Sequence, residues 1–128
     1  MDPTNKKRPV QAILMSESKE QWFDILTGKK KITIRTWYRD YVPGLVMIVS
    51  PKTNRCVEAT LTDVKYYLAK NVPEADCIAD GFSGLEDMIL GMKNYYPDFN
   101  SESEVTVVKW KDVRGLLAEK LIKGKYEL

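Results

Sequence analysis

Hydrophobic and polar residues alternate with a period of two in several short parts of the chain. Between positions 31 and 35, Ile32 and Ile34 face one way while Lys31, Thr33 and Arg35 face the other. Similar runs, rich in β-branched residues, recur along the sequence. The pattern therefore predicts four or five short strands with antiparallel pairing, drawn from residues 10–15, 31–35, 42–51, 56–68 and 104–110.

A helical period separates the first two predicted strands. Trp22, Ile25 and Leu26 fall on one helix face, and Ser18 with Gln21 forms a capping-box pair in front of them. Gly28 supplies a typical helix end. We predict a short helix between residues 18 and 28, with its apolar face in the core.

A second helical pattern follows an acidic stretch, 71–82, that we expect to be irregular. Ser83 and Glu86 form another capping-box pair, and Pro97 forbids continuation of the helix beyond "YYPD". Between them lie the apolar positions Leu85, Met88, Ile89 and Met92. A third amphipathic pattern predicts a C-terminal helix over 112–128.

Together these elements predict a single α+β domain. Two helices inserted among short strands favour a small curved sheet or β-barrel. We assign residues 1–9 to a disordered basic arm, 10–111 to the domain and 112–128 to a helical extension, on which a protein partner could dock.

Composition then narrows the chemistry. The 128-residue chain contains no histidine, and its two cysteines, Cys56 and Cys77, form no CxxC pair. This excludes most zinc sites and every catalytic arrangement that uses histidine, so we expect no metal and no cofactor, and buried free thiols. The chain has no apolar run long enough to span a membrane and no signal peptide, so we expect a cytoplasmic protein.

The net charge of +2 is too small to indicate nucleic-acid binding by itself, but the charges cluster. Three basic residues lie at 6–8 and five more between Lys29 and Arg39, while acidic residues gather at 74–80 and 102–104. The stretch "TGKKKITIRTW" contains no acidic residue. It therefore predicts either a solvated hairpin edge or the floor of a positively charged cleft.

The order of these motifs resembles the ASCH domain, a branch of the PUA-like β-barrel superfamily. The resemblance covers about residues 12–110. It rests on a Gly-x-Lys-x-x-Thr-x-Arg pattern and on an "EGF"-like element before a helix, which here are Gly28, Lys30, Thr33 and Arg35, and Asp80, Gly81 and Phe82. The family's usual glutamate is Asp80 in this chain, one methylene shorter.

This resemblance implies a cleft for a nucleotide-like ligand. Some members resemble RNA-binding modules or ribonucleases, and others remove the acyl group from acetylcytidine with a proposed Lys, Thr and Glu set. Our first hypothesis is therefore binding of RNA or a modified nucleoside in a positive cleft. The alternative is a metal-independent amidohydrolase, and the third is a protein-interaction module.

In the hydrolase alternative, Thr33 is the nucleophile, Lys30 its base and Asp80 the proton relay. In either ligand-binding hypothesis we expect further contacts from cations and aromatic side chains, since cations hold carbonyl or phosphate oxygens and aromatic faces stack on bases. These candidate ligand-binding residues are Arg35, Lys31, Trp37, Tyr38 and Phe82.

Overall fold

Five strands form one sheet in the computed structural model, which describes residues 10–15, 19–52 and 54–115. The sheet order is β1-β3-β4-β5-β2. Only β1 and β3 pair in parallel; the other neighbours are antiparallel, as predicted. The strands are β1 (Gln11–Leu14), β2 (Ile32–Thr36), β3 (Gly44–Ser50), β4 (Arg55–Leu68) and β5 (Glu104–Arg114).

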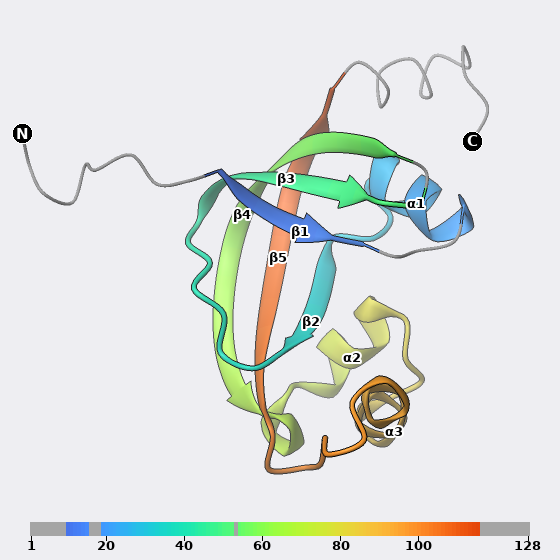
Figure 1. The fold of residues 1–128 in the computed structure, drawn as a ribbon, viewed down its shortest axis with the longest axis vertical. Helices are drawn as coiled ribbons and strands as arrows, with labels where there is room; N and C mark the ends of the chain where they lie inside the picture. The colour runs from blue at the N-terminus through green and yellow to red at the C-terminus, as the bar shows by residue number, and fades with distance from the viewer. Residues whose placement is uncertain (1–9, 16–18, 53, 116–128) are drawn as a thin grey trace, which may run out of the picture.

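The sheet is curled but does not close (Figure 1). Because β1 and β2 stand at opposite ends of the strand order, each is an edge strand. The α+β class is confirmed, and the predicted barrel is a half-barrel. The outward backbone groups of β2 are therefore available to other elements, which positions the site described below.

In the described part of the chain, three α-helices and the short 3₁₀ turn η2 (Ala69–Asn71) accompany the sheet. Helix α1 (Lys19–Leu26) lies at one end of the sheet, whereas α2 (Glu74–Asp80) and α3 (Leu85–Tyr95) lie together near β2 at the other end (Figure 1). None of the helices within the described ranges is both long and apolar enough to cross a bilayer.

Helix α2 corrects the prediction of an irregular segment at 71–82. Pro73 stands at its N-cap, and Glu74 and Asp76 in the first turn interact favourably with the helix dipole. Gly81, in the left-handed conformation with φ 116°, ends it. The helix has only seven residues, too few to show a clear apolar period.

The start of α3 also differs from the prediction. Gly84 is its N-cap, without a side-chain cap, and the Ser83 N–H donates to Asp87 Oδ2 at 2.9 Å. The Ser83–Glu86 capping box is therefore wrong. The end of the helix at Tyr95, before Pro97, is confirmed. Ser18, of the other predicted capping box, lies outside the described residues.

Strand β5 continues to Arg114 and a bend follows at Gly115, so the helical prediction is wrong at residues 112–115. Lys111 and Arg114 pair with Thr60 and Glu58 of β4, and Val113 packs on the core. The remaining residues predicted to be helical, 116–128, and the protein partner expected there lie outside the described residues. The same holds for the predicted arm at 1–9.

The core consists of two clusters joined by the long strands β4 and β5. One lies beneath α1 and includes the fully buried Trp22, Ile48 and Trp110. The other lies between β2, β5 and the helices α2 and α3. Of the two cysteines, Cys77 is buried in this second cluster, whereas Cys56 is exposed, contrary to prediction.

Candidate functional site

Gly28 turns the chain from α1 into β2. Its φ of 82° is a left-handed conformation that favours glycine, and its N–H donates to Ile25 O at 3.2 Å. The Lys30 N–H then donates to Asp24 O at 2.9 Å. These bonds fix the backbone of Lys30 immediately before β2 begins.

The Lys30 side chain forms a buried ion pair with Asp80 at the end of α2. Lys30 Nζ lies 2.6 Å from Asp80 Oδ1 and donates to the Asp80 carbonyl at 2.8 Å. Asp80 Oδ2 accepts the Ile34 N–H at 3.2 Å. Since β5 occupies the other side of β2, the Asp80 carboxylate satisfies an outward N–H of the free edge.

Both partners of this pair are largely removed from water, with side chains 9% and 10% exposed. Burial raises the pKa of Asp80, because the charged form loses hydration. The Lys30 ammonium, the Ile34 N–H and Arg35 lower it, but less than burial raises it. An acid with a raised pKa beside a lysine is a common arrangement at functional sites.

The other residues of the predicted motif are placed differently. Thr33 is buried, with its backbone opposite Val108, and within the described ranges no hydrogen bond joins its hydroxyl to Lys30. The Arg35 guanidinium donates to Met15 Sδ at the end of β1. Lys31 is exposed. The structure thus brings Lys30 and Asp80 together, with Thr33 on the same strand but not in their hydrogen-bond network.

Phe82, a predicted ligand contact, packs between helices. A Cβ at Gly91 of α3 would lie 2.8 Å from its ring, which shows how closely the phenyl group approaches that helix. Phe82 also packs against the second core cluster. Its position indicates a structural role in holding α2 against α3.

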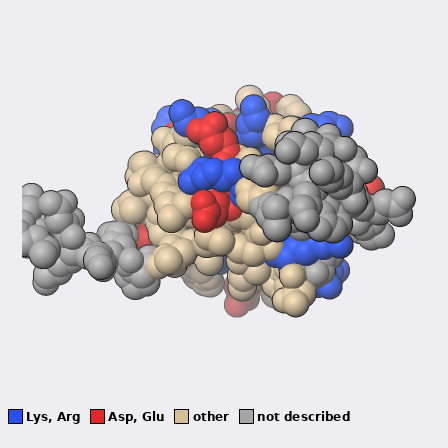
Figure 2. Space-filling view, turned by 90° about the horizontal axis from the view of Figure 1, so that it is seen from above, with Lys and Arg blue, Asp and Glu red and all other residues tan. Residues whose placement is uncertain are grey.

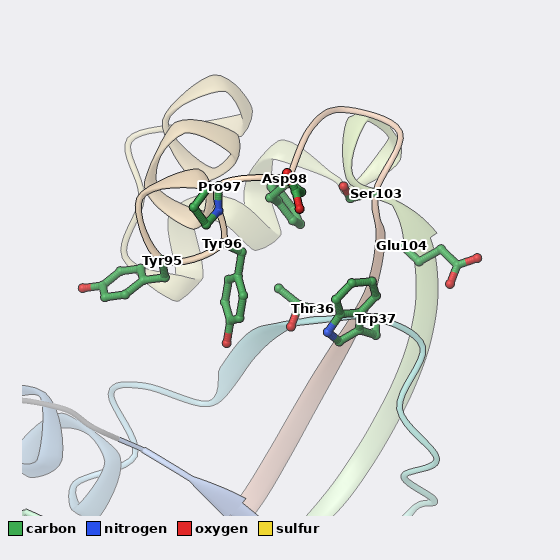
Figure 3. Close-up of a pocket in the computed structure, with 9 residues that line it drawn as sticks. Thr36, Trp37, Tyr95, Tyr96, Pro97, Asp98, Ser103 and Glu104 are labelled. Carbon is green, nitrogen blue, oxygen red and sulfur yellow. The ribbon is translucent and has the colours of Figure 1, made fainter.

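A cavity of about 370 Å³ lies at the opposite end of β2 and is here named the Trp37 cavity. Tyr96 projects from the end of α3 toward Thr36, and the Trp37 indole lies on the other side of that threonine (Figure 3). The full lining is Thr36, Trp37, Tyr95, Tyr96, Pro97, Asp98, Phe99, Ser103 and Glu104. The cavity therefore offers aromatic faces from two separate elements.

Trp37 is exposed yet firmly held. Its side chain is 66% exposed and its φ is 67°, a left-handed conformation that costs a bulky residue about 1–3 kcal/mol. The Trp37 N–H donates to Glu104 O at 2.8 Å, and the Thr106 hydroxyl donates to Trp37 O at 2.7 Å. Thr106 Oγ1 also accepts the Arg39 N–H at 2.7 Å. One buried threonine thus fixes the loop that presents the indole.

Tyr38, the next residue, points to a different place. Its ring packs edge to face on Tyr66 of β4, with centroids 5.2 Å apart. The sequence pattern pointed to Trp37 and Tyr38 as candidate ligand contacts, but not to Tyr66 or Tyr96. The signal available for Tyr96 was an aromatic pair directly before the proline that ends α3.

Charges of both signs lie around the two ends of β2. The Lys30 ammonium is neutralised by Asp80, and two carboxylates, Asp98 and Glu104, line the Trp37 cavity. Figure 2, which views the molecule from the top of Figure 1, shows basic and acidic side chains next to one another on the part of that face not drawn in grey. Within the described residues, no group of three His, Cys, Asp or Glu side chains could hold a metal ion.

Comparison with known proteins relates the chain to others by structure. No protein-family model matches the sequence, and no curated protein does. A protein from Enterococcus faecalis V583, described by the DUF984 family, is 16% identical, with a TM-score of 0.62 over 88% of each chain. An ASCH protein from Zymomonas mobilis is 15% identical, with a TM-score of 0.55 over 91% of this chain and 82% of that one. The fold is that of the ASCH proteins.

A single-residue mutant of the Zymomonas protein gives the same result, at 14% identity and a TM-score of 0.59 over 91% of this chain and 80% of the other. The resemblance inferred from the sequence is thus confirmed at the level of fold. In this ASCH-like fold, Lys30 and Asp80 meet at the free edge of β2, and the Trp37 cavity opens at the end of the same strand.

Proposed function

We propose that this chain binds a nucleobase, carried by RNA or by a modified nucleoside, in the Trp37 cavity. The observation that carries the proposal is an exposed indole held in a strained backbone conformation opposite Tyr96. Strain of this kind persists where the surroundings impose it, and it is concentrated at binding and catalytic sites. Aromatic faces of this kind stack on flat, weakly polar ligands such as nucleobases.

The polar lining supports a base rather than a phosphate as the recognised group. Thr36 and Ser103 supply hydroxyls, and Asp98 supplies a carboxylate that can accept a hydrogen bond from an exocyclic amine. A phosphate placed among Asp98 and Glu104 would be repelled. The cavity volume of about 370 Å³ lies in the usual range for small-molecule sites, roughly 300–1,000 Å³.

Tryptophan fluorescence tests this proposal directly. Of the three tryptophans, Trp22 and Trp110 are 0% and 2% exposed, so Trp37 is the one that a dissolved ligand can reach. Cytidine and acetylcytidine are expected to quench its emission in a saturable manner, whereas ribose is not. Since a stacked base contributes about 1–3 kcal/mol, Trp37→Ala is expected to weaken binding about tenfold or more, measured by calorimetry.

The matched control is Phe23→Ala, which removes an aromatic ring of 45% exposure from α1, at the other end of the sheet. It should leave the affinity unchanged. Equal affinity of wild type and Trp37→Ala for every base tested would refute the proposal.

The hydrolase hypothesis is retained as a second candidate because of the buried Lys30–Asp80 pair. Such a pair costs hydration and is often no more stabilising than apolar residues would be, so its presence at a strand edge favours a chemical role. Thr33 is the nearest candidate nucleophile along the strand. For Lys30 to act as its base, the amine would have to exchange its bond to Asp80 for one to the Thr33 hydroxyl.

This candidate predicts turnover of acetylcytidine, followed by its ultraviolet absorbance. Thr33→Val preserves shape but removes the nucleophile, so it should abolish turnover while base binding at Trp37 persists. If wild-type protein at micromolar concentration shows no absorbance change over hours, the chain is not a deacylase of this substrate.

A further inference from the structure

A second aromatic cavity lies beside the first, on the same loop. It has a volume of about 270 Å³ and is lined by Tyr38, Arg39, Asp40 and Tyr66. Tyr38 and Tyr66 are large aromatic side chains, and about half of each is exposed to solvent, 50% and 45% respectively. Thr36 and Trp37 are among the residues that line the first cavity. The residues that follow them, 38–40, line the second, so one continuous stretch of chain contributes to both cavities.

The second cavity is as firmly built as the first. The Tyr66 hydroxyl donates to Arg39 O at 2.8 Å, and the Tyr38 ring meets the Tyr66 ring at an interplanar angle of 66°. These contacts join the loop to β4 and hold the phenol rings in place. Thr106, through its bonds to Trp37 O and Arg39 N, holds both cavities in one fixed relation.

Arg39 lies between the two cavities. Its Nε donates to Thr36 O at 2.7 Å and its Nη2 to Thr36 Oγ1 at 3.0 Å, so the guanidinium touches a lining residue of the first cavity while Arg39 itself lines the second. Within the described part of the chain, Arg39 forms no ion pair. The guanidinium therefore retains donors for an anion placed between the cavities, and its charge would offset the repulsion of that anion by Asp40, which also lines the second cavity.

We infer that the site takes two consecutive unpaired nucleotides of one RNA strand. One base lies in the Trp37 cavity, the next lies against Tyr38, and Arg39 contacts the phosphate between them. This inference rests on the proposed function of the Trp37 cavity and specifies its ligand as a single strand. Stacking on aromatic side chains beside a cation is how unpaired bases are commonly bound, and paired bases are not free to separate into two cavities.

The test compares cytidylyl-(3′→5′)-cytidine with cytidine 3′-monophosphate, each titrated against Trp37 fluorescence. Both carry a 3′ phosphate, and the monophosphate has the larger negative charge, so tighter binding of the dinucleotide reports the added nucleoside rather than charge. We expect the dinucleotide to bind about tenfold more tightly. In Tyr38→Leu the ratio should fall to about one, whereas in Phe23→Leu, at the other end of the sheet, it should stay at about ten.

Salt dependence tests the phosphate contact separately. Added salt should weaken dinucleotide binding, because it screens the attraction between the guanidinium and the phosphodiester. In Arg39→Gln this salt dependence should disappear, and an unchanged salt dependence would contradict the role of Arg39.

The outcomes separate this inference from the function on which it rests. If cytidine quenches Trp37 but the dinucleotide binds no better than the monophosphate, the two-nucleotide site is wrong and the base-binding cavity stands. The same conclusion follows if Tyr38→Leu keeps the wild-type ratio. If neither probe quenches Trp37, the proposed function fails as well.

Discussion

Strand β2 carries opposite chemistry at its two ends. At its start, the charged groups of Lys30 and Asp80 are each about one-tenth exposed and satisfy one another. At its end, the Trp37 indole is 66% exposed and lines a cavity of about 370 Å³. The first end is closed and its polar groups are paired, while the second is open and its aromatic faces are uncovered.

This difference teaches that a run of like charges in the sequence can divide between surface and interior, because Lys29 and Lys31 are exposed whereas Lys30 is buried. The central lysine of "GKKK" is used inside the fold, where it neutralises the acid that covers the strand edge. Recognition is then left to side chains that the charge pattern does not mark. The strand edge and the aromatic cavity can be separated by substitution, because they share a strand but no hydrogen bond within the described residues.

The largest effect is expected at the closed end. Asp80→Ala leaves the Lys30 ammonium buried without its carboxylate, which should lower the free energy of unfolding by about 3–5 kcal/mol, measured by urea denaturation. The matched control is Glu102→Ala, which breaks the Lys70–Glu102 pair. Because those side chains are 47% and 64% exposed, its cost should be at most about 1 kcal/mol.

Replacing both partners sharpens this comparison. In Lys30→Met with Asp80→Leu no charge is left buried, so stability should return to near the wild-type value or exceed it. Base binding at Trp37 should persist in this double variant, whereas any deacylase activity should be lost. A double variant as unstable as Asp80→Ala would show that shape, rather than charge pairing, holds α2 against β2.

A smaller effect is expected at the open end, through Thr106. Thr106→Val removes the hydroxyl that bonds both Trp37 O and the Arg39 N–H, which should cost about 1–3 kcal/mol of stability and weaken base binding. Urea denaturation and the fluorescence titration measure the two losses. Thr106→Ser retains the hydroxyl and should keep the affinity; if the valine variant does too, the loop is held by other contacts.

The fold was largely predictable because the spacing of hydrophobic residues within each helix or strand reflects that element alone. The helical face of Trp22 reports burial on one side of a single element. The alternation around Ile32 and Ile34 predicted the strand, although Thr33 between them is buried as well. Helix α2 was missed because its seven residues are too few for a helical spacing of apolar residues, although a proline precedes them and a glycine follows. The strand residues 112–114 were assigned to a helix because "DVRGLL" also fits a helical face, and only pairing with β4 decides between the two.

The site was predictable only in part, for a physical reason. Lys30 and Asp80 are 50 positions apart, and the family resemblance, not any spacing, put them in one set. The Trp37 cavity depends on a left-handed turn at Trp37 and on where the end of α3 packs. Neither the turn nor that packing leaves a periodic trace in the sequence, so the partnership of Trp37 with Tyr96 becomes visible only in three dimensions.

The smallest predicted effect concerns pH and has a definite sign. Because burial raises the pKa of Asp80 above its ordinary value of 3.8, the folded chain binds this proton more tightly than the unfolded chain does. The stabilising contribution of Asp80 is therefore complete below pH 3.8 and is lost as pH rises through the folded-state pKa. Asp80→Asn, which cannot titrate, provides the reference.

We expect the difference in unfolding free energy, wild type minus Asp80→Asn, to fall with rising pH over this window. Its slope should not exceed about 1.4 kcal/mol per pH unit, the limit for one proton. Urea denaturation of both proteins across the acid range measures it.

A difference that grows with pH would mean that the Lys30 ammonium outweighs the loss of hydration. The closed end of β2 would then be a stabilising ion pair, and the energetic argument for a chemical role at Lys30 and Asp80 would fail, while the aromatic cavity at the other end would be unaffected.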